Sequence, residues 1–171
     1  MNLIAYQYFE GVDLMAIEGV SEGLIMTLIA EIGLDGIRKF PTAKQFTAWL
    51  RLAPNNKISG GKVLSNHIPK GSSRLKIAFR NTANAIGNLK EGWLADFFKR
   101  LNYKKGRATA VSALARKLAV IIWNMLVKGQ CYQPPSQYLF LDEKRKIAAA
   151  KRIQKQITKF GLTDRDIEIT K

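Results

Sequence analysis

The chain has 171 residues, of which 28 are Lys or Arg and 13 are Asp or Glu, so its formal net charge is +15. Hydrophobic residues make up 47 % of the sequence, which is enough for a core and excludes a chain that is disordered throughout. Cys131 and His67 are the single Cys and the single His, so the composition excludes a disulfide framework and a Cys-based zinc site.

The sequence also argues against export and against a membrane span. Its first residues lack the early Lys or Arg of a secretory signal. The most apolar run, Leu118–Val127, is about half as long as a spanning helix. We therefore expect a basic, cytoplasmic protein with no membrane contact.

Apolar residues at spacings of three and four predict a mostly α fold. In chain order the predicted helices are Leu24–Ile32, a helix that begins after Thr42 and ends before Pro54, a long helix after Ser72 or Ser73, Trp93–Leu101, Ala108–Val127 and Asp142–Phe160. Ser21 is a predicted N-cap, Gly33 a stop, and Thr42 forms a capping box with Gln45.

The predicted apolar stripes indicate which helices build the core. The stripe of the helix after Ser72 or Ser73 is Leu75, Ile77, Ala78, Ala85 and Ile86. The stripe of Ala108–Val127 is Val111, Leu114, Ala115, Leu118, Ile122 and Met125. The thin stripe of Asp142–Phe160 is Ile147, Ile153 and Ile157. Residues 54–72 are rich in Gly, Pro, Asn and Ser and predict a loop, with one short extended piece near Val63. Cys131–Leu139 contains two prolines and is predicted to be extended.

The charges are separated along the sequence. Residues 1–35 hold six acids and no base, whereas residues 36–90 hold eleven bases and no acid. A second basic run occupies residues 144–159 and forms either a solvated arm or a nucleic-acid contact. A long stretch without a compensating carboxylate favours a polyanionic partner, and nucleic acid is the first candidate. An acidic protein partner, or the chain's own acidic N-terminal segment, is the alternative.

Two glycine-containing segments could contact phosphates. Residues 14–23, followed by an apolar helix, resemble a helix–hairpin–helix whose turn at Gly19 would direct backbone N–H groups at a phosphate; the alternative is a turn that packs in the core. In residues 55–62, Ser59 precedes Gly60 and Gly61, which let a ligand approach the backbone. A serine hydroxyl among cations could attack a phosphodiester, although Ser-Gly-Gly is also common in surface turns.

Other residues give weaker signals. His67 is a candidate base for Ser59, but it is more often an exposed residue or a nucleic-acid contact, and Ser65 near it makes no triad without an acid. The three tryptophans lie on apolar faces and are expected to be core anchors. Cys131 is expected to be a partly buried structural thiol.

Four segments in order resemble the C-terminal domain of insertion-sequence transposases and Piv-type DNA invertases. They read GVSEGLIMTLIAEIG, FPTAKQFTAWLRLAPNNKISGGK, IPKGSSRLKIAFRNTANAIG and KGRATAVSALARKLAVIIWNML. Members of this family join a RuvC-like domain with four carboxylates to a serine-bearing domain, and bridge RNA directs its transposases. The resemblance implies that Ser59 is the DNA nucleophile. We assign the nucleic-acid contacts to Lys57, Gly60, Gly61, Lys62, Lys70, Arg74, Lys76 and Arg80.

The resemblance also suggests how the chain is divided. It predicts a serine domain at residues 12–128, preceded by a linker remnant at 1–11 and followed by a Pro-containing linker and basic helical tail at 129–171. The chain shows no RuvC-like segment, so we expect a fragment that is inactive alone, without a cofactor of its own, because Mg²⁺ would need the carboxylates of the missing domain. The expected partners are DNA, a structured guide RNA and further copies of the chain, in a bacterial or archaeal nucleoid. The alternative is a non-catalytic nucleic-acid-binding module.

Overall fold

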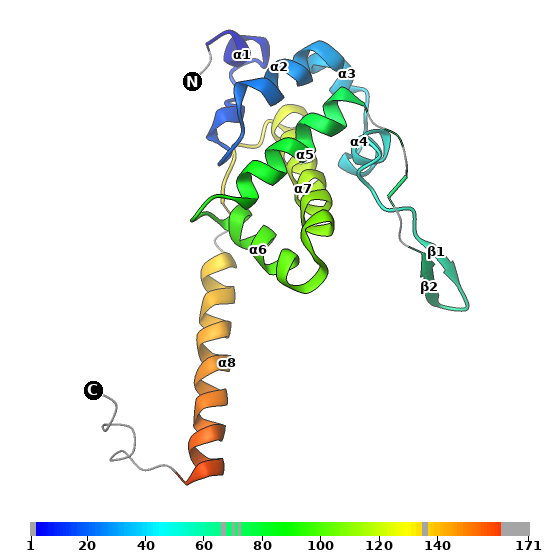
Figure 1. Cartoon of the computed structure of the whole chain (residues 1–171). Helices are drawn as coiled ribbons and strands as arrows, with labels where there is room; N and C mark the ends of the chain where they lie inside the picture. The colour runs from blue at the N-terminus through cyan, green and yellow to red at the C-terminus, as the bar shows by residue number, and fades with distance from the viewer. Residues whose placement is uncertain (1–2, 66–67, 70, 72, 135–136, 162–171) are drawn as a thin grey trace. The chain divides into compact units, whose positions relative to one another are not determined.

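The computed structural model describes residues 3–65, 68–69, 71, 73–134 and 137–161, and it is mostly helical (Figure 1). Its elements are α1 (Leu3–Tyr8), the 3₁₀ turn η1 (Leu14–Ala16), α2 (Glu22–Glu31), α3 (Gly33–Arg38), α4 (Ala43–Trp49), β1 (Lys57–Ser59), β2 (Lys62–Ser65), α5 (Arg74–Gly87), α6 (Trp93–Lys105), α7 (Arg107–Lys128) and α8 (Gln137–Phe160). The mostly α prediction is confirmed. Residues up to Gln133 form one compact unit, and a second unit contains α8.

Helix α7 is the centre of the first unit and packs against α3, α4, α5 and α6 (Figure 1). The predicted stripe of α7 is confirmed, because its six residues are all buried. Small residues on the same face, Ala110 and Ala119, are also buried and let the neighbouring helices approach closely. The core therefore forms around this one helix.

Among the described residues, α7 is the one helix whose length and apolar composition would suit a membrane span, although core helices of globular proteins have the same properties. The sequence analysis considered only its most apolar part, whereas the helix has 22 residues. Its neighbours bury 61 % of the apolar stretch. Packing in the core thus accounts for the composition of α7.

The helix caps agree with the sequence. The Thr42 hydroxyl accepts a hydrogen bond from the Gln45 backbone N–H at the start of α4, and the Ser73 hydroxyl caps α5 in the same way by accepting from Lys76. Ser21 occupies the N-cap position of α2, and α2 ends two residues before Gly33. The boundaries at Thr42 and Ser73 depend on local hydrogen bonds, so the sequence suffices to predict them, whereas Ser21 makes no side-chain capping bond.

Several predictions of local structure were wrong. Residues 57–59 of the predicted loop form β1, whereas β2 confirms the extended piece expected near Val63. Helix α6 continues to Lys105, and α8 begins at Gln137 within a segment predicted to be extended. The buried face of α5 is rotated from the predicted stripe: Ile77 and Ala85 are exposed, and Phe79 is buried instead. The rotation arises because α2, α6 and α7 all pack against α5 and together select its buried face.

Residues before Val12, which the sequence analysis assigned to a linker, take part in the core. Helix α1 buries Ala5, and Phe9 directly after it is 1 % exposed. The ring of Phe9 meets the ring of Tyr8 edge to face, with the centroids 5.1 Å apart. The compact unit therefore includes α1.

Gly87 provides a test of the contact between α5 and α6. A Cβ at Gly87 would lie 2.6 Å from two atoms of the Phe98 ring, which is itself buried. We expect Gly87→Ala to lower the free energy of unfolding by about 1–2 kcal/mol, because overpacking outweighs the gain in helix propensity. Urea unfolding measures the change.

The matched control is Gly23→Ala in α2. A Cβ at Gly23 would meet only the Ser21 hydroxyl oxygen, at 3.8 Å. This variant should gain up to about 1 kcal/mol of stability. Equal stability changes in the two variants would contradict the tight contact at Phe98.

Candidate nucleic-acid interface

Strands β1 and β2 form an antiparallel hairpin whose turn consists of two glycines (Figure 1). Ser59 pairs with Lys62, so Gly60 and Gly61 make the turn. Their φ angles are +55° and +74°, as a two-residue type I′ turn requires and as Gly adopts without strain. The Ser-Gly-Gly-Lys sequence is therefore a hairpin signal, which the loop prediction missed.

Ser59 and Lys62 are neighbours across the hairpin. Side chains directly opposite each other in an antiparallel pair lie on the same face, with Cβ atoms about 4.5–5.5 Å apart. Both residues are exposed, and no atom lies within 4 Å of the Cβ that Gly60 or Gly61 would carry. A phosphate can therefore approach the Ser59 hydroxyl and the Lys62 ammonium from the same side.

The hairpin contributes little to the core. All three residues of β1 are exposed, and Lys57 pairs with Ser65 across a shift in the register. Ile58 is 63 % exposed and Leu64 is 69 % exposed. Because folding does not bury these side chains, they remain accessible to a ligand.

The predicted contacts on α5 differ in their accessibility. Arg74 begins the helix with its side chain 88 % exposed, and its Nε lies 4.0 Å from a carboxylate oxygen of Glu31. Arg80 is half-buried, and its guanidinium donates a hydrogen bond to the Ser112 hydroxyl on α7 at 3.0 Å. Lys70 lies outside the described residues. The three cations of α5 thus do not form one exposed row, because Lys76 points into the protein.

Lys76 fastens the chain that returns from the hairpin to α5. The residue is 7 % exposed, and its ammonium donates hydrogen bonds to the backbone carbonyls of Gly71 at 2.9 Å and Pro69 at 3.3 Å. Burial lowers the pKa of Lys76, and the nearby positive charges of Arg80 and Arg51 lower it further. Its ammonium therefore already serves the fold, and a phosphate contact by Lys76 stays a prediction.

Arg51 was not among the predicted contacts, although it belongs to the same cluster of charges. Its own φ is +54°, and a Cβ at Gly71 would come within 1.9 Å of its guanidinium. Gly71 has a φ of +110° as well, so both the space and the backbone conformation require glycine there. The glycine thus makes room for Arg51 beside the start of α5.

Most of the helices around α7 come from sequence segments that contain almost no Asp or Glu. No Asp or Glu occurs in residues 36–90, and none occurs in residues 97–141. These stretches supply α4, the hairpin, α5, most of α6 and all of α7. The fold thus gathers sequence segments that each lack negative charge, which concentrates positive potential there.

The acidic N-terminal segment pairs with a few of the bases. The Arg38 guanidinium donates a hydrogen bond of 3.0 Å to Glu10, and this bond lowers the pKa of the Glu10 carboxyl. Glu31 lies near Arg74. Among the described residues, the ion pairs of the acidic segment go to Arg38 and Arg74 and not to the hairpin cations Lys57 and Lys62, which favours an external polyanion over the internal alternative.

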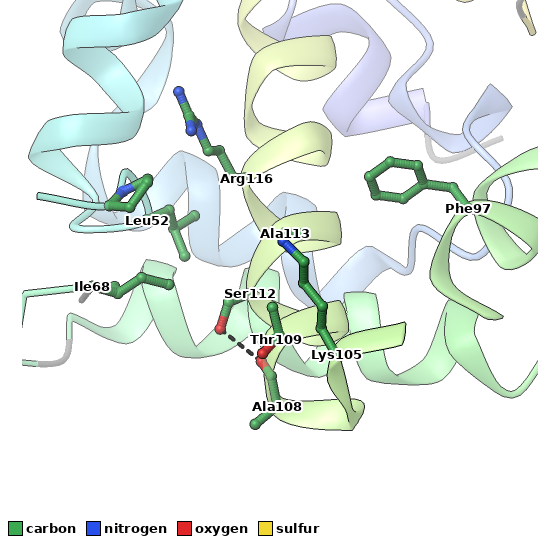
Figure 2. A pocket seen from close by; sticks show the side chains of 10 residues that line it. Leu52, Ile68, Phe97, Lys105, Ala108, Thr109, Ser112, Ala113 and Arg116 are labelled. Atoms are coloured by element: carbon green, nitrogen blue, oxygen red, sulfur yellow. Dashed lines mark hydrogen bonds between the residues drawn. The ribbon is translucent and has the colours of Figure 1, made fainter. Parts of the chain in front are cut away.

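Sequence reasoning also missed two cations that line a cleft beside α7. Lys105 at the end of α6 and Arg116 in the middle of α7 line this cleft, and Figure 2 shows both side chains beside α7. The sequence did contain a signal for these two cations: both lie in residues 97–141, a second stretch without acid, whereas the first such stretch ends before Glu91.

The structure packs the Gly19 turn against the core, although Gly19 itself is exposed. Only the single 3₁₀ turn η1 precedes it, where a full helix was expected. Ile17 and Val20 on either side are buried, and a Cβ at Gly19 would lie 2.5 Å from the Ile86 side chain. These contacts support the core-packing alternative, and a phosphate contact by this turn stays a prediction.

The tryptophans and the cysteine depart in part from expectation. Trp123 is buried and donates to the Phe40 carbonyl, and the half-buried Trp93 donates to the Tyr132 hydroxyl. Trp49, however, is 48 % exposed and packs on one side against Phe46 and Phe40.

Cys131 is exposed, so the prediction of a partly buried thiol was wrong. His67 lies outside the described residues.

The described residues do not fit a metal site, because no three of their His, Cys, Asp or Glu side chains cluster as ligands. We therefore derive no step through a metal from this chain. The expectation that Mg²⁺ would be held by carboxylates of another domain stays a prediction.

The family can be identified by comparison. The sequence pattern of the transposase IS116/IS110/IS902 family matches residues 13–99, just over half of the 171 residues. This chain belongs to that family. The match begins just before η1 and includes α2 to α5, the hairpin and the first half of α6. Ser59 and all eight predicted nucleic-acid contacts lie within it.

Individual relatives of the IS116/IS110/IS902 family agree with this. A "Probable family 20 transposase" of Pseudomonas aeruginosa is 31 % identical over 71 % of this chain, which corresponds to 36 % of the relative. The "Insertion element IS110 uncharacterized 43.6 kDa protein" of Streptomyces coelicolor is 32 % identical over 70 % of this chain and 29 % of its own length. The "Transposase for insertion sequence element IS1111A" of Coxiella burnetii is 29 % identical over 69 % of this chain and 33 % of its own length. The chain thus spans about a third of these relatives.

The lowered pKa of Lys76 predicts a dependence of stability on pH. Above neutral pH the folded protein releases the Lys76 proton first, whereas the unfolded chain keeps it until the usual pKa of 10.5. Because the unfolded state then binds more protons, stability rises with pH in this window. We expect the stability of the wild type to increase relative to Lys76→Met up to pH 10.5, as measured by urea unfolding. A constant or falling difference would contradict this assignment.

Proposed function

We propose that this chain is the serine-bearing, nucleic-acid-binding part of a DNA transposase. The observation that carries the proposal is the hairpin, where Ser59 stands exposed beside an open two-glycine turn and opposite Lys62. The acid-free sequence stretches that supply α4, the hairpin, α5 and α7 support it, since proteins without a polyanionic partner normally mix both signs of charge. Family membership supports DNA as the polyanion.

The proposed reaction is the attack of the Ser59 hydroxyl oxygen on a DNA phosphodiester. A bond forms between Oγ and phosphorus, and the bond from phosphorus to one deoxyribose oxygen breaks. The serine proton passes to a base, and the departing oxygen takes up a proton. Lys62 and Lys57 would stabilise the negative charge that develops on the phosphoryl oxygens.

The base and any Mg²⁺ belong, in this proposal, to a RuvC-like domain supplied from outside residues 1–171. A structured guide RNA and self-association follow from the same family resemblance and remain part of the proposal. The site of action would be the DNA in the cytoplasm. A non-catalytic binding module is the second candidate, because the exposed cations would hold phosphates equally well without Ser59.

The first test is the dependence of DNA binding on salt. Each phosphate neutralised on duplex DNA contributes about −0.9 to the slope of log affinity against log salt. We expect Lys62→Gln to weaken binding to any duplex and to make this slope smaller by about 0.9. Lys128→Gln, at the far end of α7, is the matched control and should leave the slope unchanged. Binding that does not depend on salt would overturn both candidate functions.

The second test separates catalysis from binding. With a RuvC-like carboxylate domain supplied, the chain should form a protein–DNA adduct that survives denaturing electrophoresis. Ser59→Ala should abolish the adduct and leave binding intact, because it removes the attacking oxygen but no cation. Ser65→Ala, in the same hairpin, is the control and should keep the adduct. An adduct that persists in Ser59→Ala would place the nucleophile elsewhere, whereas binding without any adduct favours the non-catalytic module.

A further inference from the structure

A cleft of about 730 Å³ lies beside the first half of α7 (Figure 2). The residues that line it are Leu52, Pro54, Ile68, Phe97, Lys105, Ala108, Thr109, Ser112, Ala113 and Arg116. Its volume falls in the range of about 300–1,000 Å³ that is typical of small-molecule sites. The cleft is therefore large enough to hold a compact organic group.

One wall of the cleft is apolar. Ile68 lies across the cleft from α7, which contributes the small side chains of Ala108 and Ala113 (Figure 2). Leu52 beside it is only 1 % exposed, so the half-buried Ile68 and Pro54 provide the accessible apolar surface on that side. Such a wall offers contact to the face of a flat ring but no hydrogen bond to its edge. The face of an aromatic base can pack on it whatever the base, as extruded bases pack between aromatic or apolar side chains.

Cations and hydroxyl groups complete the cleft. Lys105 extends along α7 towards Ala113, and Arg116 lies at one end of the cleft (Figure 2). The Ser112 hydroxyl donates to the Ala108 carbonyl at 2.9 Å and accepts from Arg80 at 3.0 Å, which brings a third positive charge to the side of the cleft. No acidic side chain is among the residues that line it. This set of groups suits a phosphate next to an apolar ring.

The cleft adjoins the hairpin through the chain itself. Pro54 precedes β1 and Ile68 follows β2, and both residues line the cleft. At about 3.3 Å per residue, Ser59 can lie at most roughly 17 Å from Pro54. A strand held in the cleft is thus close enough to continue towards the hairpin.

We propose that this cleft binds one unpaired nucleotide, with its base against Pro54 and Ile68 and its phosphate on Lys105 and Arg116. The inference rests on the proposed nucleic-acid binding and adds a preference for an unstacked base. A paired duplex keeps its bases stacked and would offer the cleft only phosphates. The nucleotide comes from a DNA strand or from an RNA, and the two probes below distinguish these sources.

The test measures the affinity of the 171-residue chain for short single-stranded DNA and RNA of mixed sequence by fluorescence anisotropy. Lys105→Gln should weaken binding about tenfold, since it removes a charge-assisted contact to phosphate. The matched control is Lys104→Gln, which removes the same charge one residue away, outside the lining of the cleft. Lys104 and Lys105 are both exposed, so neither variant disturbs the core.

A second pair of variants tests the base itself. Ala108→Trp fills the cleft from an exposed position, and Ala30→Trp places the same side chain on the exposed surface of α2. We expect Ala108→Trp, but not Ala30→Trp, to weaken single-strand binding while duplex binding is unchanged. An oligonucleotide with several abasic sites should bind the wild type more weakly than the intact one.

The outcomes separate this proposal from the function on which it rests. If the cleft variants lose affinity for only the DNA probe or only the RNA probe, the result supports the cleft and identifies the source of the nucleotide. If they lose affinity for both probes, the result supports a cleft that accepts either strand. Equal losses of affinity in Lys105→Gln and Lys104→Gln, or equal affinity for intact and abasic strands, would overturn the proposal that the cleft binds a nucleotide. Neither result would contradict DNA binding by the chain. If the wild-type chain binds no nucleic acid at low salt, the proposed function and the cleft fail together.

Discussion

The burial of α7 among four other helices is the constraint on which the rest of the structure depends. Its core face carries small and branched apolar residues, so α3, α4, α5 and α6 can all approach it. The first half of the same helix also lines the cleft, and Ser112 there connects to Arg80 of α5. A substitution that shifts α7 would therefore change the core and the cleft together. The exposed hairpin is largely independent of this packing, because β1 buries no side chain.

The second constraint is electrostatic. A formal charge of +15 on 171 residues opposes folding through self-repulsion. The structure brings positive groups close together at the start of α5, where burial and then the charges of Arg80 and Arg51 lower the pKa of Lys76. A polyanion bound along these helices would reduce the repulsion, and a ligand that binds only the folded state also stabilises it. If the proposed polyanion binds there, binding and stability are coupled through the same charges.

Local features of the fold were predictable from the sequence, and features that depend on distant neighbours were not. The caps at Thr42 and Ser73 were correct because a cap needs only its own helix. The predicted core stripe of α7 was correct because α3, α4, α5 and α6 pack around that helix and bury a broad face of it. Ile77 and Trp49 were assigned to the core on apolar character alone, yet both are largely exposed. The hairpin was missed because its two short strands carry a weak pattern, although the Gly-Gly turn was a usable signal.

The sequence by itself determined the basic character, the mostly helical class and the turn that presents Ser59, since each follows from composition or from residues close along the chain. Only the tertiary structure decided which cations face a ligand. It directs Lys76 inward onto backbone carbonyls, and it brings Lys105 and Arg116 to one cleft with side chains from beyond β2. The physical reason is that a helix can turn any face towards its neighbours, and the contacts that select this face join residues far apart in the sequence.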